Sequence, residues 1–332
     1  MPKRPSAPES ALFRQHKKDG FLLLKNKRYK EALSPLKDAL NLAPSNAKIL
    51  SGLAFATRKI GMFDESIKYY QAILAVTPED CQTLCGIGDC LKGRKQWAEA
   101  IRYFEKALAI NPKDEYSLTG LGDAYRGNNQ EEEAIEVWKK LIAFNPNNTY
   151  VLTRLGDRYR MKKAWNEAIQ YYQKVLALNA SDIFALTGIG DCYRGTERSQ
   201  EAMAVWTKII GVAPNNKYIL GRLADMYRKE RSWREAIHYY EKVLTIDNVD
   251  PYALTGLYCT YLLGLSDKAK AAEIEKRIAK LDSLNVKKIL LIKLGDTYRY
   301  ENKLAEAKEC YRELLAIDPA NTAAHEKLQA LS

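Results

Sequence analysis

The stretch that decides the fold is Leu118 to Arg126, with the sequence Leu-Thr-Gly-Leu-Gly-Asp-Ala-Tyr-Arg. Close copies begin at Leu152, Leu186 and Leu220, so each copy follows the one before it at the same interval. A constant interval of this size indicates one supersecondary unit stacked on copies of itself. We therefore expect an array in which each repeat contacts only its neighbours and in which function lies on the stacked surface.

Each repeat contains two apolar patterns with helical spacing, separated by polar residues such as those from Gly127 to Gln130. Most repeats end in a proline, which can close one helix but cannot continue it. Each repeat is therefore predicted to be a helix, a turn, a second helix and a second turn. The eighth repeat is longer than the others by three residues, which fall between Gly264 and Val286.

This register divides the chain into three parts. The parts are a basic, proline-containing N-terminal arm at 1–12 that we expect to be disordered, nine repeats at 13–46, 47–80, 81–114, 115–148, 149–182, 183–216, 217–250, 251–287 and 288–321, and a C-terminal capping helix at 322–332.

The composition is that of a soluble, folded chain, since 46% of the residues are hydrophobic and 28% are charged. No apolar run approaches the roughly 18 residues needed to cross a bilayer. No secretory signal is visible at the start, so we expect a cytoplasmic protein without membrane insertion. Residues 1 to 30 contribute +7 of the net charge of +11. The remaining residues therefore lack the basic stripe expected of a nucleic-acid groove.

No catalytic, cofactor or metal site is predicted. Cys81, Cys85 and Cys90 lie close in sequence, but no fourth ligand for a structural zinc site is evident, and small buried thiols explain them better. The three histidines lie in separate parts of the array without a repeated nucleophile beside them. The glycines around Gly122 follow no predicted strand, so they do not form a phosphate-binding loop.

Small residues recur at one position of each predicted helix, and a large aromatic residue follows in the second helix. The first-helix position holds Gly20, Ala54, Gly88, Gly122, Gly156, Gly190, Ala224 and Gly295. The second-helix position holds Ala32, Ala100, Ala134, Ala168, Ala202, Ala236 and Ala307, and the aromatic position holds Tyr70, Phe104, Trp138, Tyr172, Trp206, Tyr240 and Tyr311. These residues resemble the repeat pattern of the tetratricopeptide repeat family, and the resemblance extends from residue 13 to residue 321. It implies an all-α, right-handed superhelical solenoid of nine helix-turn-helix repeats with a C-terminal capping helix.

The recurring glycine also has a physical reason. Glycine within a helix costs about 1 kcal/mol relative to alanine, so its return at one position implies that another helix passes too close for a side chain. The sequence also has a second period, which is twice the length of one repeat. At one position of the repeat, Gly120, Gly188 and Gly256 alternate with Arg154, Arg222 and Lys293. The surface is therefore expected to repeat every two units.

Polar and aromatic residues recur on one face of the predicted first helix, at spacings of three and four residues. The family resemblance implies that this face lines a concave groove that binds extended or helical peptides. The candidate ligand-binding residues are Tyr116, Thr119, Asp123, Arg126, Tyr150, Thr153, Asp157, Arg160, Phe184, Thr187, Asp191, Arg194, Tyr218, Asp225 and Arg228.

The aspartates and the arginines of this list each recur at one repeat position, and we call these two sets the aspartate row and the arginine row. Two roles fit them. Asp123 and its equivalents can pair with arginines of the same or the next repeat and hold the pitch of the superhelix. The arginines can also exchange onto a ligand carboxylate, and the two roles are compatible. The chaperone-tail clamp of the family uses lysine and asparagine on this face, where this chain has Thr119 and Asp123. That particular activity is therefore not predicted.

The predicted function is a non-enzymatic scaffold that binds a peptide or protein segment, with acidic residues of the partner facing the arginine row. One alternative is a nucleic-acid-binding solenoid, which the aspartate row disfavours because it would repel phosphates. The other alternative is a regulatory or targeting subunit of an enzyme complex, which differs from a scaffold only in its partner.

Overall fold

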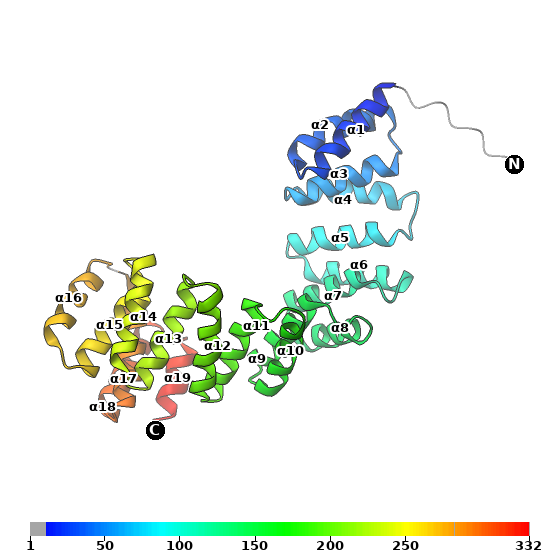
Figure 1. Cartoon of the computed structure of the whole chain (residues 1–332). Coiled ribbons are helices and arrows are strands. Elements are labelled where there is room, and N and C mark those ends of the chain that lie inside the picture. The colour runs from blue at the N-terminus through cyan, green and yellow to red at the C-terminus, as the bar shows by residue number, and fades with distance from the viewer. Residues whose placement is uncertain (1–10, 282, 332) are drawn as a thin grey trace. The chain divides into compact units, whose positions relative to one another are not determined.

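The computed structural model describes residues 11–281 and 283–331. These residues form nineteen α-helices and one π-helix without any β-strand, and consecutive helices pair as helix-turn-helix units (Figure 1). The prediction of an all-α repeat fold is confirmed. Residues 1–10 of the arm predicted at 1–12 lie outside the described residues. Helix α1 begins at Ala11. Within the described ranges, no helix is long and apolar enough to cross a membrane.

The chain divides into a first unit that ends at Arg158 and a second unit that begins at Tyr159. The first unit contains α1 (Ala11–Lys25), α2 (Tyr29–Leu42), α3 (Ala47–Lys59), α4 (Phe63–Leu74), α5 (Cys81–Gly93), α6 (Trp97–Ile110), α7 (Glu115–Gly127) and α8 (Glu131–Phe144). Helix α9 (Thr149–Met161) contains the boundary.

The second unit continues with the remaining helices. They are α10 (Trp165–Leu178), α11 (Ile183–Gly195), α12 (Ser199–Val212), α13 (Lys217–Lys229), α14 (Trp233–Ile246), α15 (Pro251–Cys259), the π-helix η1 (Thr260–Gly264), α16 (Lys268–Ala279), α17 (Leu284–Tyr300), α18 (Leu304–Ile317) and α19 (Thr322–Gln329).

Most first helices of the pairs begin at a side-chain cap, although Ser283 makes none at the start of α17. The carboxylate of Asp114 accepts a hydrogen bond from the backbone N–H of Ser117 at 2.7 Å, and Asp182 accepts one from Ala185 at 2.9 Å. Such a cap satisfies a donor that the helix itself leaves unpaired and contributes about 1 kcal/mol. The same cap is made by Asn46, Asp80, Asn148, Asn216, Asp250 and Asn321.

The turn inside a pair reverses the chain through one residue with a left-handed backbone. Lys95 has a φ of 60° and Asn129 has a φ of 60°, while Gly61 fills this role between α3 and α4 with a φ of 83°. Glycine adopts this conformation without the steric cost that a side chain imposes. The turns therefore tolerate polar residues where a glycine would be the usual choice.

The core of each unit is built by aromatic rings of the second helices. The ring of Phe104 in α6 lies between Gly88 of its own pair and Gly120 of the next pair, and a Cβ atom at either glycine would collide with it. Trp138 is fully buried against Gly122 in the same way. The close approach predicted from the recurring glycine is therefore present, but an aromatic ring makes it rather than the backbone of a neighbouring helix.

The two-repeat rhythm follows the kind of ring. Tyr172 and Tyr240 pack against Gly188 and Gly256 of the following pair. The phenol of Tyr240 would overlap a Cβ atom at Gly256, because its hydroxyl oxygen reaches that helix. Trp138 and Trp206 are followed by Arg154 and Arg222 at the equivalent position. Glycine therefore stands where a phenylalanine or tyrosine ring reaches the next pair, and arginine stands after the tryptophans.

The eighth pair departs from this pattern. Helix α15 has 9 residues and continues directly into the five-residue π-helix η1. Helix α17 begins at Leu284, four residues before the expected repeat start at 288, and has 17 residues where α13 has 13. The extra residues of this region therefore lengthen the start of α17. The boundaries of the nine repeats otherwise stay a prediction.

Candidate functional site

The candidate residues lie on the first helices α7, α9, α11 and α13, and we call the side of each unit that carries them the first-helix face. Its aromatic side chains are exposed: Tyr116 to 52%, Tyr150 to 42%, Phe184 to 79% and Tyr218 to 51%. The rings therefore offer apolar contact area to a ligand. The threonine row is half-buried, and it consists of Thr119, Thr153 and Thr187.

Tyrosine hydroxyls of this face link successive first helices. The hydroxyl of Tyr150 donates to the Asp123 carboxylate at 2.9 Å, so that α9 is tied to α7. In each such link the tyrosine follows the aspartate by 27 residues, a separation that helical spacing alone does not predict. The other links join Tyr116 to Asp89, Tyr218 to Asp191 and Tyr252 to Asp225.

Cations of the preceding repeat complete this arrangement. Lys92 Nζ lies 3.6 Å from Asp123, and Arg160 Nη1 lies 3.7 Å from Asp191. Arg58 pairs in the same way with Asp89. The cation thus comes from the corresponding position of the repeat before each aspartate. These contacts connect neighbouring repeats, as the structural role of the rows requires.

Three arginines surround Asp191 in the second unit. Arg194 and Arg222 place guanidinium nitrogens 3.6 Å and 3.5 Å from its Oδ1 atom, and Arg160 approaches Oδ2. The Asp191 side chain is 8% exposed, whereas that of Arg194 is 45% exposed. Three guanidinium groups from three first helices therefore contact this one carboxylate.

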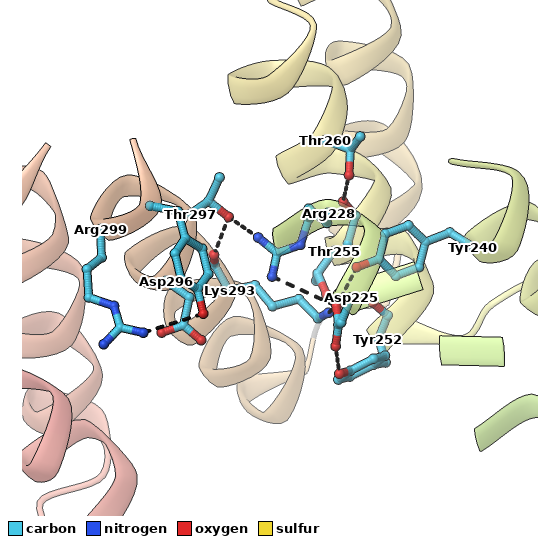
Figure 2. A network of polar contacts seen from close by, with 12 residues as sticks. Asp225, Arg228, Tyr240, Tyr252, Thr255, Thr260, Lys293, Asp296, Thr297 and Arg299 are labelled. Carbon is cyan, nitrogen blue, oxygen red and sulfur yellow. Dashed lines mark hydrogen bonds and ion pairs between the residues drawn. The ribbon is translucent and has the colours of Figure 1, made fainter. Parts of the chain in front are cut away.

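Asp225 and Arg228 lie in a largely enclosed network instead of on an open surface (Figure 2). Lys293 of α17 reaches Asp225 at 2.5 Å, and Arg228 donates to the hydroxyl of Thr297. Arg228 and Lys293 are buried. Tyr240 and Tyr252 also donate to Asp225. Helix α17 therefore covers the part of α13 where the sequence placed the end of the arginine row.

The electrostatics of this network follow from its burial and its charges. Burial alone would raise the pKa of Asp225, but Lys293 and Arg228 outweigh burial and hold that pKa below its usual value. Burial, followed by the charge of Asp225, raises the pKa of Tyr240 to about 12. The network therefore holds a carboxylate and a neutral phenol in their stable forms at neutral pH.

A cleft of about 710 Å³ opens on the first-helix face of the first unit. Phe21 and Phe55 contribute rings to it, and Lys48, Arg58 and Tyr116 add polar groups. Sequence reasoning missed the first two pairs as a binding site, because their first helices lack the recurring aspartate and tyrosine. The signal that could have found the cleft is the aromatic pair Phe21 and Phe55, which hold the same position in successive repeats.

Cys81 and Cys85 of α5 meet Asp114 at the start of α7, with one ligand atom from each lying within 4.8 Å of the others. Asp114 already caps α7, and the Cys85 sulfur lies 2.9 Å from the hydroxyl of Ser117. Burial raises the pKa of Cys85 to about 12, which favours the neutral thiol. Three donors also fall one short of the four that a structural zinc ion takes.

Comparisons with known protein families match several parts of the chain. Models described as tetratricopeptide repeat match residues 45–113, 91–154, 219–250 and 289–321. Taken together, these matches cover more than half of the chain. Among curated proteins, no relative matches it.

Solved structures with the same architecture are similar to this chain. The C-terminal part of a TPR repeat-containing protein from Cytophaga hutchinsonii has 15% identity, with a TM-score of 0.53 over 83% of this chain and 98% of that one. PilF of Pseudomonas aeruginosa has 20% identity, with a TM-score of 0.52 over 61% of this chain and 92% of that one. At these identities the likeness shows the fold alone.

Proposed function

The chain belongs to the tetratricopeptide repeat family, and from that premise we propose that it is a non-enzymatic scaffold that binds a segment of a partner protein on its first-helix face. Proteins of this family generally act as protein-protein interaction scaffolds and are typically non-catalytic. The regulatory or targeting subunit considered from the sequence is a scaffold of the same kind with an enzyme as its partner.

The cleft of the first unit is the observation that carries this proposal. Its volume of about 710 Å³ lies within the range of roughly 300–1,000 Å³ that is typical of ligand pockets. Phe21, Phe55 and Tyr116 supply aromatic walls, and aromatic side chains dominate the energetics of binding sites. A bulky apolar side chain of a partner segment fits such a cleft.

Cations at the edge of the cleft support an acidic partner. Lys48 lines the cleft and also a shallow depression around Phe21, where Arg14, Lys17 and Lys18 join it. Complementary charge speeds the encounter of two proteins and selects among partners. We therefore propose that acidic residues flank the apolar anchor of the partner segment.

Affinity capture with a matched pair of variants tests the proposal. Ser51 is an exposed residue that lines the cleft, so Ser51→Trp should fill the cleft without disturbing the core. Gln71 is an exposed residue of the second helix α4, so Gln71→Trp adds the same side chain elsewhere. Proteins captured by the wild type should be identified by mass spectrometry before and after nuclease treatment.

The expected result is a nuclease-resistant partner that Gln71→Trp retains and Ser51→Trp loses by at least about tenfold, which corresponds to about 1.4 kcal/mol of binding free energy. Capture that disappears with nuclease would support the nucleic-acid-binding alternative instead. Equal capture by both tryptophan variants would show that the cleft is not part of the binding surface.

A further inference from the structure

Two cysteines and one aspartate meet at the wall of the cleft in the first unit. Cys81 and Cys85 lie about one turn apart on α5, and Asp114 comes directly before α7, the next first helix. One ligand atom of each lies within 4.8 Å of the other two, and all three residues line the cleft. We call these three residues the dithiol site, because they bring two thiols and a carboxylate to one point of the surface.

Core packing explains Cys90 but does not explain Cys81. Cys90 is fully buried, and Ala124 fills the same position in the next repeat. Cys81 is only half-buried, and its position holds Glu115 and Thr149 in the next two repeats, where both side chains are exposed. A small apolar residue is therefore not required at this position, and the Cys81 thiol is available for chemistry outside the core.

The donor atoms of the dithiol site are not consumed by other contacts. Both thiols are free. The Cys85 sulfur lies 2.9 Å from the hydroxyl oxygen of Ser117, and the Cys81 sulfur lies 3.7 Å from the carbonyl oxygen of Ala107. A thiol is a weak hydrogen-bond donor, so such contacts cost little to give up. Ser117 donates twice to Oδ2 of Asp114, which leaves Oδ1 without a hydrogen bond from the described residues.

This set of donors selects the kind of ion that fits. Magnesium and calcium prefer oxygen ligands, whereas thiolates select softer ions such as zinc. Zinc binds cysteine sulfur and carboxylate oxygen in a tetrahedron. A structural zinc site takes all four ligands from the protein, whereas a site with three protein ligands keeps its fourth position for water or another molecule. Three donors at the wall of a cleft match the second kind of site.

A disulfide between the two cysteines fits the geometry less well. Residues four apart on a helix have Cβ atoms about 5–6 Å apart, whereas a disulfide needs a separation of about 3.5–4.5 Å. Closing the bond would therefore distort the first turn of α5. Two sulfurs on one zinc ion lie roughly 3.8 Å apart, given a zinc-sulfur distance of about 2.3 Å, and zinc also uses the carboxylate.

We propose that Cys81, Cys85 and Asp114 bind a zinc ion whose fourth position opens into the cleft. On binding, each thiol releases its proton to water and coordinates the ion as a thiolate. The fourth position then holds water or a nitrogen or sulfur donor that enters the cleft. The ligands come from two neighbouring repeats, so the ion also links α5 to α7. The zinc site does not depend on the scaffold function proposed above, because its three protein ligands all belong to this chain.

Cobalt(II) is the probe for this site, because it takes the same tetrahedral ligands as zinc and its absorption reports them. The reduced, metal-stripped full chain is titrated with cobalt(II) in the absence of oxygen. We expect one ion per chain, with thiolate-to-cobalt charge-transfer bands and the intense d–d bands of tetrahedral coordination. Zinc should displace the cobalt, and magnesium should not. Absence of the charge-transfer bands would overturn the proposal.

Three variants assign the ligands, and each installs the residue of a neighbouring repeat so that the fold is retained. The models for Cys81→Thr, Cys85→Thr and Asp114→Asn are Thr149, Thr119 and Asn148. Each cysteine variant should weaken zinc binding by at least about 100-fold, because losing a ligand costs more than the 10- to 100-fold typical of losing an outer-shell partner. Asp114→Asn keeps the helix cap and should weaken binding by at least about tenfold.

Cys90→Ala is the matched control, because Cys90 lies on the same helix but contacts Ser66 of α4. Its zinc affinity should equal that of the wild type. Undiminished affinity in Cys85→Thr, or an equal loss in Cys90→Ala, would contradict the assignment of the thiols. Undiminished affinity in Asp114→Asn would overturn the carboxylate as a ligand. Circular dichroism of every variant shows whether the fold is retained.

Imidazole and thermal melting complete the test. Imidazole added to the cobalt-loaded chain should shift the d–d bands, because a nitrogen donor replaces the water at the fourth position. An unchanged spectrum would mean that this position is not open. Zinc should raise the melting temperature of the wild type, because an ion that binds only the folded state stabilises it, and should not raise that of Cys85→Thr. An equal rise in both chains would place the zinc elsewhere.

Discussion

At the scale of single residues, two glycines of the second unit lie in opposite surroundings. A Cβ atom at Gly190 would collide with the indole of Trp206, whereas one at Gly211 would meet nothing within 4 Å. Gly190→Ala should therefore destabilise the chain by about 1–3 kcal/mol through overpacking. Gly211→Ala should stabilise it by about 0.5–1 kcal/mol, because alanine is the better helix former.

Thermal melting followed by circular dichroism measures both changes. The melting temperature should fall for Gly190→Ala and rise for Gly211→Ala. If the two substitutions shift it in the same direction, the ring of Trp206 does not occupy the space that Gly190 leaves.

The buried phenol of Tyr240 predicts sensitivity to alkali. Its pKa is raised from about 10 to about 12, so the folded state keeps a proton that the unfolded state loses. This stabilisation is fully present below about pH 10 and is lost as the pH rises through about 12. Cys259, with a pKa raised to about 11 by burial, adds a change of the same sign.

Urea unfolding at a series of pH values from 8 to 12 tests this expectation. The free energy of unfolding should fall at the alkaline end, and tyrosinate absorbance should rise with the unfolding transition. Tyr240→Phe should depend less on pH in this range, because its ring cannot titrate. An identical pH dependence in that variant would place the alkaline sensitivity elsewhere.

At the scale of helices, Asp225 couples α13 to α17. Asp225→Asn would leave Lys293 and Arg228 buried without a counter-charge, and such a loss costs about 3–5 kcal/mol. The equivalent residue in the first unit is Asp123, which pairs with Lys92 at 3.6 Å. The Lys92 side chain is 22% exposed, whereas that of Lys293 is 4% exposed. Water can therefore solvate the cation that Asp123→Asn leaves, and this substitution should cost about 1 kcal/mol or less.

Chemical denaturation of the two variants compares these costs directly. The change in the free energy of unfolding should be several times larger for Asp225→Asn. Similar small losses in both variants would mean that water compensates the charges of the α17 contact.

Helix α16 should be the least protected of the internal second helices. Its buried side chains are Ala271 and Ile274, and no aromatic ring anchors it, whereas α12 buries Trp206. Local opening takes less free energy where few apolar contacts are broken. Hydrogen exchange followed by mass spectrometry should therefore be faster in 268–279 than in 199–212. Equal protection would show that the departure of the eighth pair from the repeat pattern does not weaken it.

The helices themselves were largely predictable from the sequence. Spacings of three and four residues predicted each helix, and recurring glycines predicted close packing, because both are properties of one repeat. The start of α17 at Leu284 was not predictable, because the repeat spacing places the start of this repeat at 288. The sequence does not say whether the inserted residues lengthen a turn or a helix. The π-helix at 260–264 was missed because a π-turn has no apolar period of its own.

At the scale of the whole molecule, the candidate site was only partly predictable. The aromatic and charged rows were found from their spacing, and their members lie on the first helices as expected. Their partners, such as Tyr150 for Asp123, depend on how far one repeat is displaced from the next. The burial of Arg228 depends on α17, a helix that begins only at Leu284, two repeats later in the chain. Such contacts depend on how the repeats stack on one another, which cannot be predicted from the sequence of a single repeat.

Site-specific photo-crosslinking tests the central claim, that a partner segment lies on the first-helix face. Tyr116 on the first helix α7 lines the cleft and is 52% exposed, and Phe144 at the end of the second helix α8 of the same unit is 38% exposed. Each can be replaced by a photoreactive phenylalanine. We predict that the captured partner crosslinks to position 116 and not to position 144. Crosslinking at 144 with none at 116, in chains that both bind the partner, would contradict the claim.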